Sequence, residues 1–230
     1  MFDAIVASPM FGFVLSLLFF EFGVFVQNKT KSTAANPLLI CAILVIAFLK
    51  IFGISYEEYM EGAGFISIFL APCTALLAVN IYNNLDTIKK YLLPILFGTA
   101  AAAASSMGCV YLLCKLFGLD QTMLYSLLPK SVTTAISMPL AGMTGGVESI
   151  LVAATITTGV LCAMISPLLI KLFRFKNPVA AGIAIGASGH GVGTAAAIKL
   201  GPVQGATAGI AIGMSGLFTV LFYSILFSVA

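Results

Sequence analysis

The sequence predicts an all-α integral membrane protein with about six full transmembrane helices, two re-entrant or broken helical segments and internal repeats. Of the 230 residues, 60% are hydrophobic and 8% are charged, whereas charged residues make up about 25% of typical soluble domains. Apolar runs of the roughly 20 residues that a helical span needs recur along the chain. One glycine-rich run at membrane depth contains the single histidine. Together these observations predict a transporter-like membrane fold.

The composition also limits domain number and partners. No stretch resembles a separate soluble domain, so we expect a single transmembrane domain over residues 1–230, with the lipid bilayer as its main partner. The net charge of +3 is too small to indicate a nucleic-acid partner. Residues 1–10 contain Asp3 and no basic residue, so a cleavable signal peptide is not expected. The five cysteines lack metal or redox spacing, and we expect neither metal nor cofactor.

Six apolar stretches predict full crossings. They cover about residues 4–26, 37–54, 62–84, 91–117, 149–170 and 203–229. The first ends at a polar segment, residues 27–31. An acidic loop with tyrosines, residues 55–61, suits a membrane interface. Two further stretches, 121–145 and 180–200, are expected to re-enter or break.

The distribution of charge favours re-entry by residues 121–145. If the N-terminus is outside and this segment returns to the face it entered, seven of the eleven basic residues are cytoplasmic and six acidic residues are outside. The basic residues are Lys29, Lys31, Lys89, Lys90, Lys171, Arg174 and Lys176, and the acidic residues are Asp3, Glu57, Glu58, Glu61, Asp120 and Glu148. A crossing would instead place the basic loop 171–176 outside, against the positive-inside tendency.

The run Ala181–Lys199, AGIAIGASGHGVGTAAAIK, predicts a break inside the membrane. Each glycine costs a helix roughly 1 kcal/mol relative to alanine, and non-helical backbone in a bilayer must be buried in protein or line a wet cavity. The residues expected to face a substrate there are Ser188, His190, Gly191, Gly193 and Thr194. Alternatively, the glycines let helices pack closely and the histidine is a buried, satisfied polar group.

Lys130 lies in a second polar break, within LLPKSVTT at residues 127–134. Pro129 frees a carbonyl, and the following side chains supply an ammonium and three hydroxyls, a set that suits a carboxylate. These substrate-binding candidates are Lys130, Ser131, Thr133 and Thr134. A buried lysine needs an anionic ligand or partner to stay charged. The alternative places Lys130 near an interface, where its side chain snorkels.

His190 and Glu21 are the candidate proton relay. Histidine changes charge within the physiological pH range, although His190 can equally serve only as a hydrogen-bond donor to a substrate. Glu21 lies within the first predicted span. It is either a counter-ion to Lys130 or an interface residue, and the sequence favours neither.

Two internal similarities suggest a repeat-built transporter. AGIAIGASG at Ala181–Gly189 recurs as AGIAIGMSG at Ala208–Gly216, and we expect these two adjacent segments to run antiparallel. A weaker likeness joins Leu70–Tyr82 to Leu127–Pro139. The alternative is low-complexity helix sequence, in which Gly, Ala and Ile match by chance.

The motifs LPKSVTTAISMP at Leu128–Pro139 and GASGHGVGTAAA at Gly186–Ala197 resemble those of the LrgB/CidB family. These are antiholin-like inner-membrane proteins whose plant relatives are plastidial glycolate/glycerate translocators. The likeness covers nearly the whole chain, including residues 56–62 and 71–74. One departure is Gly189, which separates Ser188 from His190 where the family usually has them adjacent.

The resemblance implies a multi-pass protein of the bacterial inner membrane with an LrgA/CidA-type membrane partner. Our leading hypothesis is a proton-coupled carrier for small monocarboxylates such as glycolate, glycerate, pyruvate or lactate, with Lys130 and nearby hydroxyls binding the carboxylate. The alternative is an antiholin-like regulator of murein hydrolase export and cell lysis. A homodimer stays open, because no residue argues for it.

The residues argue against an enzyme. The sequence has no second histidine for a metal cluster, no Gly-Lys-Ser/Thr phosphate loop and no carboxylate pair beside His190. The run Gly189–Gly193 is no dinucleotide fingerprint, because no strand and ribose-binding acid surround it. We therefore expect a non-catalytic protein whose ligand is a small organic anion.

Overall fold

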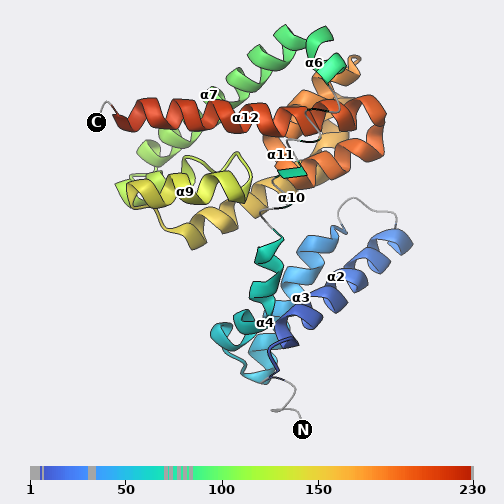
Figure 1. Ribbon diagram of the computed structural model, residues 1–230, viewed down its shortest axis with the longest axis vertical. Coiled ribbons are helices and arrows are strands. Elements are labelled where there is room, and N and C mark those ends of the chain that lie inside the picture. Colours follow the sequence, from blue (N-terminus) through green and yellow to red (C-terminus); the bar gives the residue numbers. More distant parts are fainter. Residues whose placement is uncertain are drawn as a thin grey trace. The chain divides into compact units, whose positions relative to one another are not determined.

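The computed structural model describes residues 6, 8–30, 35–69, 72, 75, 76, 79, 82 and 85–228 (Figure 1). Within these ranges every regular element is an α-helix, and five helices are long and apolar enough to cross a bilayer. The predicted all-α membrane fold is confirmed. The chain divides into two compact units, Met1–Cys73 and Thr74–Ala230, and a single domain over residues 1–230 stays a prediction.

The first unit contains three described helices of more than ten residues: α2 (Phe11–Thr30), α3 (Pro37–Phe52) and α4 (Tyr56–Ile68). The Asn36 side chain caps α3, and Gly53 ends it in the left-handed conformation with φ 67°. Helix α2 packs against both α3 and α4. At 16 residues, α3 is about 24 Å long, so it is shorter than the roughly 30 Å hydrocarbon core that it was predicted to cross.

Two boundaries in the first unit differ from the prediction. Helix α2 continues through residues 27–30, where we predicted its polar end. The acidic segment begins a helix, because Ser55 and Glu58 form a reciprocal capping box. The backbone N–H and the hydroxyl of Ser55 both donate to the Glu58 carboxylate, which lowers the pKa of Glu58. The predicted span 62–84 falls largely outside the described residues beyond Phe69 and stays a prediction.

The second unit is built on three long helices: α7 (Leu92–Leu116), α10 (Glu148–Leu172) and α12 (Pro202–Ser228). They agree with the predicted spans 91–117, 149–170 and 203–229 to within a few residues. A short helix, α6 (Leu85–Lys90), precedes α7. Helix α12 runs through the unit and packs against α7 and α11 (Pro178–Leu200) (Figure 1).

Residues 121–145 form a hairpin of two short helices, α8 (Gln121–Leu127) and α9 (Thr134–Thr144). Both ends of this first hairpin lie beside the C-terminal part of α12: the Tyr125 ring packs on Phe227 at 5.2 Å between centroids, and the hydroxyls of Thr144 and Tyr223 are 2.5 Å apart. The chain therefore returns to where it entered, in agreement with the predicted re-entry. Neither helix approaches the roughly 20 residues of a span.

Helix α11 is also a hairpin, although its 23 residues are long and apolar enough to cross. His190 has φ 47° and ψ −132°, which breaks the helix into two halves. A Cβ built on Gly193 would lie 2.8 Å from the carbonyl oxygen of Ile185. In a straight helix these residues would be about 12 Å apart along the axis. The halves therefore fold back on each other, and this second hairpin agrees with the break predicted within residues 180–200.

The two copies of the AGIAIG repeat run in the same direction, so the antiparallel prediction was wrong. Gly182 lies against Gln204 and Thr207, and Gly186 lies against Ala208. The reason is the second half of α11, which reverses the chain between the two copies. For the weaker repeat, the structure describes only Pro72, Ala75, Leu76, Val79 and Tyr82 of the first copy.

Candidate functional site

The tips of the two hairpins meet inside the second unit. The imidazole of His190 interacts with the backbone of Ser131 and lies close enough to the Lys130 ammonium for a Coulombic interaction. Ser131 is 9% exposed and His190 is 5% exposed. The structure thus brings together the two motifs that the sequence analysis treated separately, which are 60 residues apart.

Lys130 and Ser131 form the polar tip of the first hairpin. The Lys130 ammonium donates to the Ser131 hydroxyl at 3.4 Å, and the Ser131 hydroxyl also pairs with that of Ser106 on α7. Lys130 is only partly exposed, and the part of the chain that the structure describes gives it no carboxylate partner. The cation is therefore available to an anion at this place.

Several buried polar atoms of the second unit have no hydrogen-bond partner within the described residues. They are Thr133 Oγ1, Thr155 Oγ1, His190 Nε2 and Thr194 Oγ1. Thr133 is the residue that precedes α9, a position where a threonine hydroxyl usually caps the helix, yet its side chain makes no such bond. Leaving a buried polar atom unpaired costs about 1–3 kcal/mol. Such a group indicates a functional role or a bound water or ligand.

The electrostatics of the site favour an anion. Helix α9 begins at the tip of the first hairpin, and the second half of α11 begins at Gly191. A helix N-terminus carries partial positive charge, and transporters use the ends of broken helices in this way near the middle of the bilayer. Two such ends add to the charge of Lys130.

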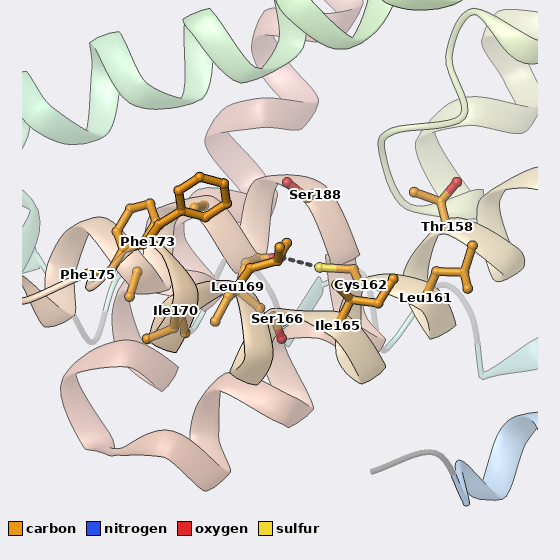
Figure 2. A pocket seen from close by; sticks show the side chains of 13 residues that line it. Thr158, Leu161, Cys162, Ile165, Ser166, Leu169, Ile170, Phe173, Phe175 and Ser188 are labelled. Atoms are coloured by element: carbon orange, nitrogen blue, oxygen red, sulfur yellow. Dashed lines mark hydrogen bonds between the residues drawn. The ribbon is translucent and has the colours of Figure 1, made fainter.

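Three other predicted site residues are not among these buried unpaired groups. Ser188 is exposed and lines an apolar groove between α10 and α11, where Figure 2 shows it at one edge. Thr134, in the first turn of α9, is partly exposed. Glu21 is exposed on α2 in the other unit. The binding or relay roles assigned to these residues stay predictions.

The glycines of α11 serve close packing, as the alternative interpretation proposed. A Cβ on Gly182 or Gly186 would collide with atoms of α12, and one on Gly189 would lie 2.6 Å from Cys162 Sγ on α10. Gly193 lets the two halves of the hairpin approach each other closely, whereas a Cβ on Gly191 would meet nothing within 4 Å. Close packing and a polar break therefore coexist in one segment.

The sequence analysis missed two hydroxyl residues, Ser106 and Thr155. Ser106 ends a run of small residues within α7, and Thr155 lies within the apolar helix α10. Single hydroxyls inside apolar spans usually bond to their own helix backbone. Their only sequence signal was the Ser105–Ser106 pair, which is too common to single out.

Two polar hairpins within a helical unit define a class: multi-pass membrane proteins with broken helices around a buried polar site. Residues 16–229 match the model of the LrgB-like family, and the chain belongs to this family. It is 41% identical over 215 residues to the antiholin-like protein LrgB of Bacillus subtilis strain 168, covering 93% of each chain. It is 36% identical to proteins of the same name from Bacillus mycoides strain KBAB4 and Bacillus cereus strain B4264, covering 93% of this chain and 94% of theirs.

No solved structure matches the chain. Family membership and the five long apolar helices establish a multi-pass bacterial membrane protein. The resemblance found in the two motifs is confirmed.

Proposed function

We propose that this chain has the antiholin-like function for which its relatives are named. In this role it restrains murein hydrolase export and cell lysis, together with an LrgA/CidA-type membrane partner. The observation that supports the proposal is the similarity itself, which reaches 41% identity over 93% of both chains. The role is one of binding and regulation and involves no enzymatic step.

A lysis assay tests this function. Cells lacking both their LrgA-type and LrgB-type proteins would receive this chain alone, an LrgA-type partner alone, or both, and autolysis would be followed by optical density and by murein hydrolase activity in the medium. We expect both measurements to fall only when the two proteins are present together. Unchanged lysis, with the chain shown to be inserted in the membrane, would contradict the proposal.

A second candidate function is favoured by the site at the hairpin tips. A carrier for small monocarboxylates would use Lys130, Ser131 and Thr133 to bind the carboxylate, because these groups supply a cation and hydroxyl donors at a buried place. His190, with Nε2 unpartnered, would donate a hydrogen bond or relay a proton. Movement of the two hairpins against the long helices would provide alternating access. A purely structural regulator has no evident need for four buried polar atoms without partners.

Proteoliposome uptake distinguishes this candidate from the first. Purified protein alone would be tested with labelled glycolate, pyruvate and lactate, with and without an inward proton gradient. We expect saturable uptake that increases with the gradient and is lost in Lys130→Ala and His190→Ala variants that remain folded. Lys115→Ala is the matched control, because Lys115 is an exposed cation at the end of α7.

The results separate the two functions. Saturable uptake by the protein alone that is lost in the Lys130→Ala and His190→Ala variants supports a carrier, whether or not lysis changes. No uptake by inserted protein, with suppression of lysis by the pair, leaves the antiholin-like function standing by itself. Equal uptake by the parent protein and the Lys130→Ala variant would contradict the site assignment.

A further inference from the structure

The apolar groove lies between α10 and the first half of α11, and extends from the loop after α10 toward the tip of the second hairpin, where Ser188 lines it. It has a volume of about 480 Å³, within the roughly 300–1,000 Å³ of small-molecule sites. Leu161, Ile165 and Leu169 of α10 and its C-cap residue Phe173 line it at four-residue intervals (Figure 2). Ala184 and Ile185 of α11 also line it. Residues four apart share one face of a helix, so the groove is elongated along α10.

The length of the groove fits one lipid tail. Its lining extends along α10 from Thr158 to Phe173, which corresponds to about 22 Å of helix. Half of the hydrocarbon core is about 15 Å thick, so a chain in the groove would reach from the loop after α10 to the middle of the bilayer. The lining contains no charged residue, which suits an acyl chain.

The charge at one end of the groove indicates the headgroup. Phe173 and Phe175 line that end and alternate with the exposed residues Lys171, Arg174 and Lys176. No acidic residue occurs between Glu148 and the C-terminus, so these three cations have no acidic neighbour in the sequence. Basic pockets between membrane helices on the cytoplasmic side bind anionic lipid headgroups, and the positive-inside tendency places this loop on that side.

A buried hydroxyl adds polar chemistry near the charged end. Ser166 lines the groove, is 5% exposed, and its hydroxyl has no hydrogen-bond partner within the described residues. It lies five residues before Lys171 on the same helix, which is about 8 Å along the axis. An ester oxygen between a headgroup at Lys171 and a tail in the groove would lie within its range.

We infer that this groove binds an anionic glycerophospholipid, with one acyl chain along α10 and the phosphate held by Lys171, Arg174 and Lys176. This inference does not rest on the proposed function, and the proposed phosphate site lies at the loop after α10. An anionic lipid bound here would hold α10 and the first half of α11 together at the base of the second hairpin.

Native mass spectrometry of the full chain in detergent would test the site with phosphatidylglycerol and phosphatidylcholine as probes. We expect phosphatidylglycerol to bind more tightly at low salt and the preference to shrink at high salt. Replacing Lys171, Arg174 and Lys176 together by glutamine should weaken phosphatidylglycerol binding about 100-fold. Lys89→Gln with Lys90→Gln is the control, because these cations end α6 elsewhere in the unit.

The groove itself is tested by filling it. Ala184 is exposed and lines the groove, so Ala184→Phe should reduce binding of both lipids and abolish the preference. Ala153→Phe is the control, because Ala153 is exposed on α10 outside the groove. Equal affinity for the two lipids, or undiminished phosphatidylglycerol binding by the triple glutamine variant, would overturn the proposal.

A photo-crosslinking amino acid at Ile165 identifies the occupant in native membranes. Adducts with the mass of anionic phospholipids support the site, provided that they are enriched relative to a probe at Leu168, which is 64% exposed on the same helix outside the groove. Adducts with a second copy of the chain, or with another protein, would show that protein covers the groove and would overturn the proposal.

Discussion

Both units of the molecule use glycine to bring helices together, but among the residues that the structure describes only the second unit contains a broken helix. In the first unit, a Cβ on Gly12 of α2 would lie 2.6 Å from the amide nitrogen of Ala63, and one on Gly62 would lie 2.7 Å from the nitrogen of Gly12. In the second unit, Gly182 and Gly186 make the same kind of approach to α12. Glycine at a helix crossing is therefore a general packing device in this protein.

The difference lies in the polar groups. All buried polar atoms without a hydrogen-bond partner, as far as the structure describes the chain, belong to the second unit, on α10, α11 and the tip of the first hairpin. The glycines alone thus do not mark a site. The site is distinguished by a break in the helices, which places a cation, an imidazole and hydroxyls in the packed interior.

The largest expected effect comes from adding a methyl group at the crossings. Gly12→Ala and Gly186→Ala should each destabilise the protein by about 2–3 kcal/mol, because the added Cβ meets backbone that cannot move aside locally. The loss of stability is measured by thermal unfolding in detergent, which is monitored as the loss of the monodisperse peak in size-exclusion chromatography.

Matched controls for the crossings are Gly64→Ala and Gly191→Ala, where an added Cβ meets nothing within 4 Å. These changes should be neutral or stabilise by up to about 1 kcal/mol. If all four substitutions behaved alike, the packing explanation would fail in both units.

The helix break gives the next effect. His190 is held at φ 47°, where a residue other than glycine is strained by about 1–3 kcal/mol. His190→Gly should therefore raise the unfolding temperature relative to His190→Ala, since both variants lack the imidazole and only glycine relieves the backbone. An Ala variant as stable as the Gly variant would mean that the break is not strained.

Much of this arrangement follows from the sequence, for physical reasons. Pro129 and Lys130 are costly inside a membrane helix, so they indicate a break from composition alone, and the glycines around His190 do the same. The positive charge of residues 171–176 then favours a hairpin over a crossing for residues 121–145. These signals are local, and local signals predict where a helix ends.

Contacts between distant segments were harder to predict. The pairing of Ser106 with Ser131 and the approach of His190 to Ser131 depend on how two hairpins pack, which no local pattern encodes. The direction of the AGIAIG copies was predicted wrongly for the same reason. The glycines predicted a break within residues 180–200, but a break alone does not specify that the chain folds back on itself, as the two halves of α11 do at His190.

In each unit a tyrosine hydroxyl forms a hydrogen bond between two helices. Tyr59 pairs with Ser16 at 2.7 Å between α4 and α2, and Tyr223 pairs with Thr144 at 2.5 Å between α12 and α9. Tyr59→Phe and Tyr223→Phe should each cost about 1 kcal/mol. Tyr56→Phe, at an exposed position, is the control for thermal unfolding.

The smallest effect is expected at the exposed capping box of α4. Hydrogen bonds from Ser55 lower the pKa of Glu58, so the ionised carboxylate contributes stability above the ordinary pKa of glutamate. This contribution is lost as the pH falls through the lowered value. The difference in unfolding temperature between the parent protein and Glu58→Gln should shrink from pH 7 to pH 3.

The shape of α11 has a consequence for how the protein is made. Its hydropathy is the lowest of the five candidate spans and its buried share is the highest, and each half is too short to remain in lipid by itself. Gly182 and Gly186 pack on α12, which the ribosome synthesises later. We therefore expect α11 to stay at the membrane surface or in a sheltered path until α12 has been synthesised, so the packing of the second hairpin is completed only after α12 has left the ribosome.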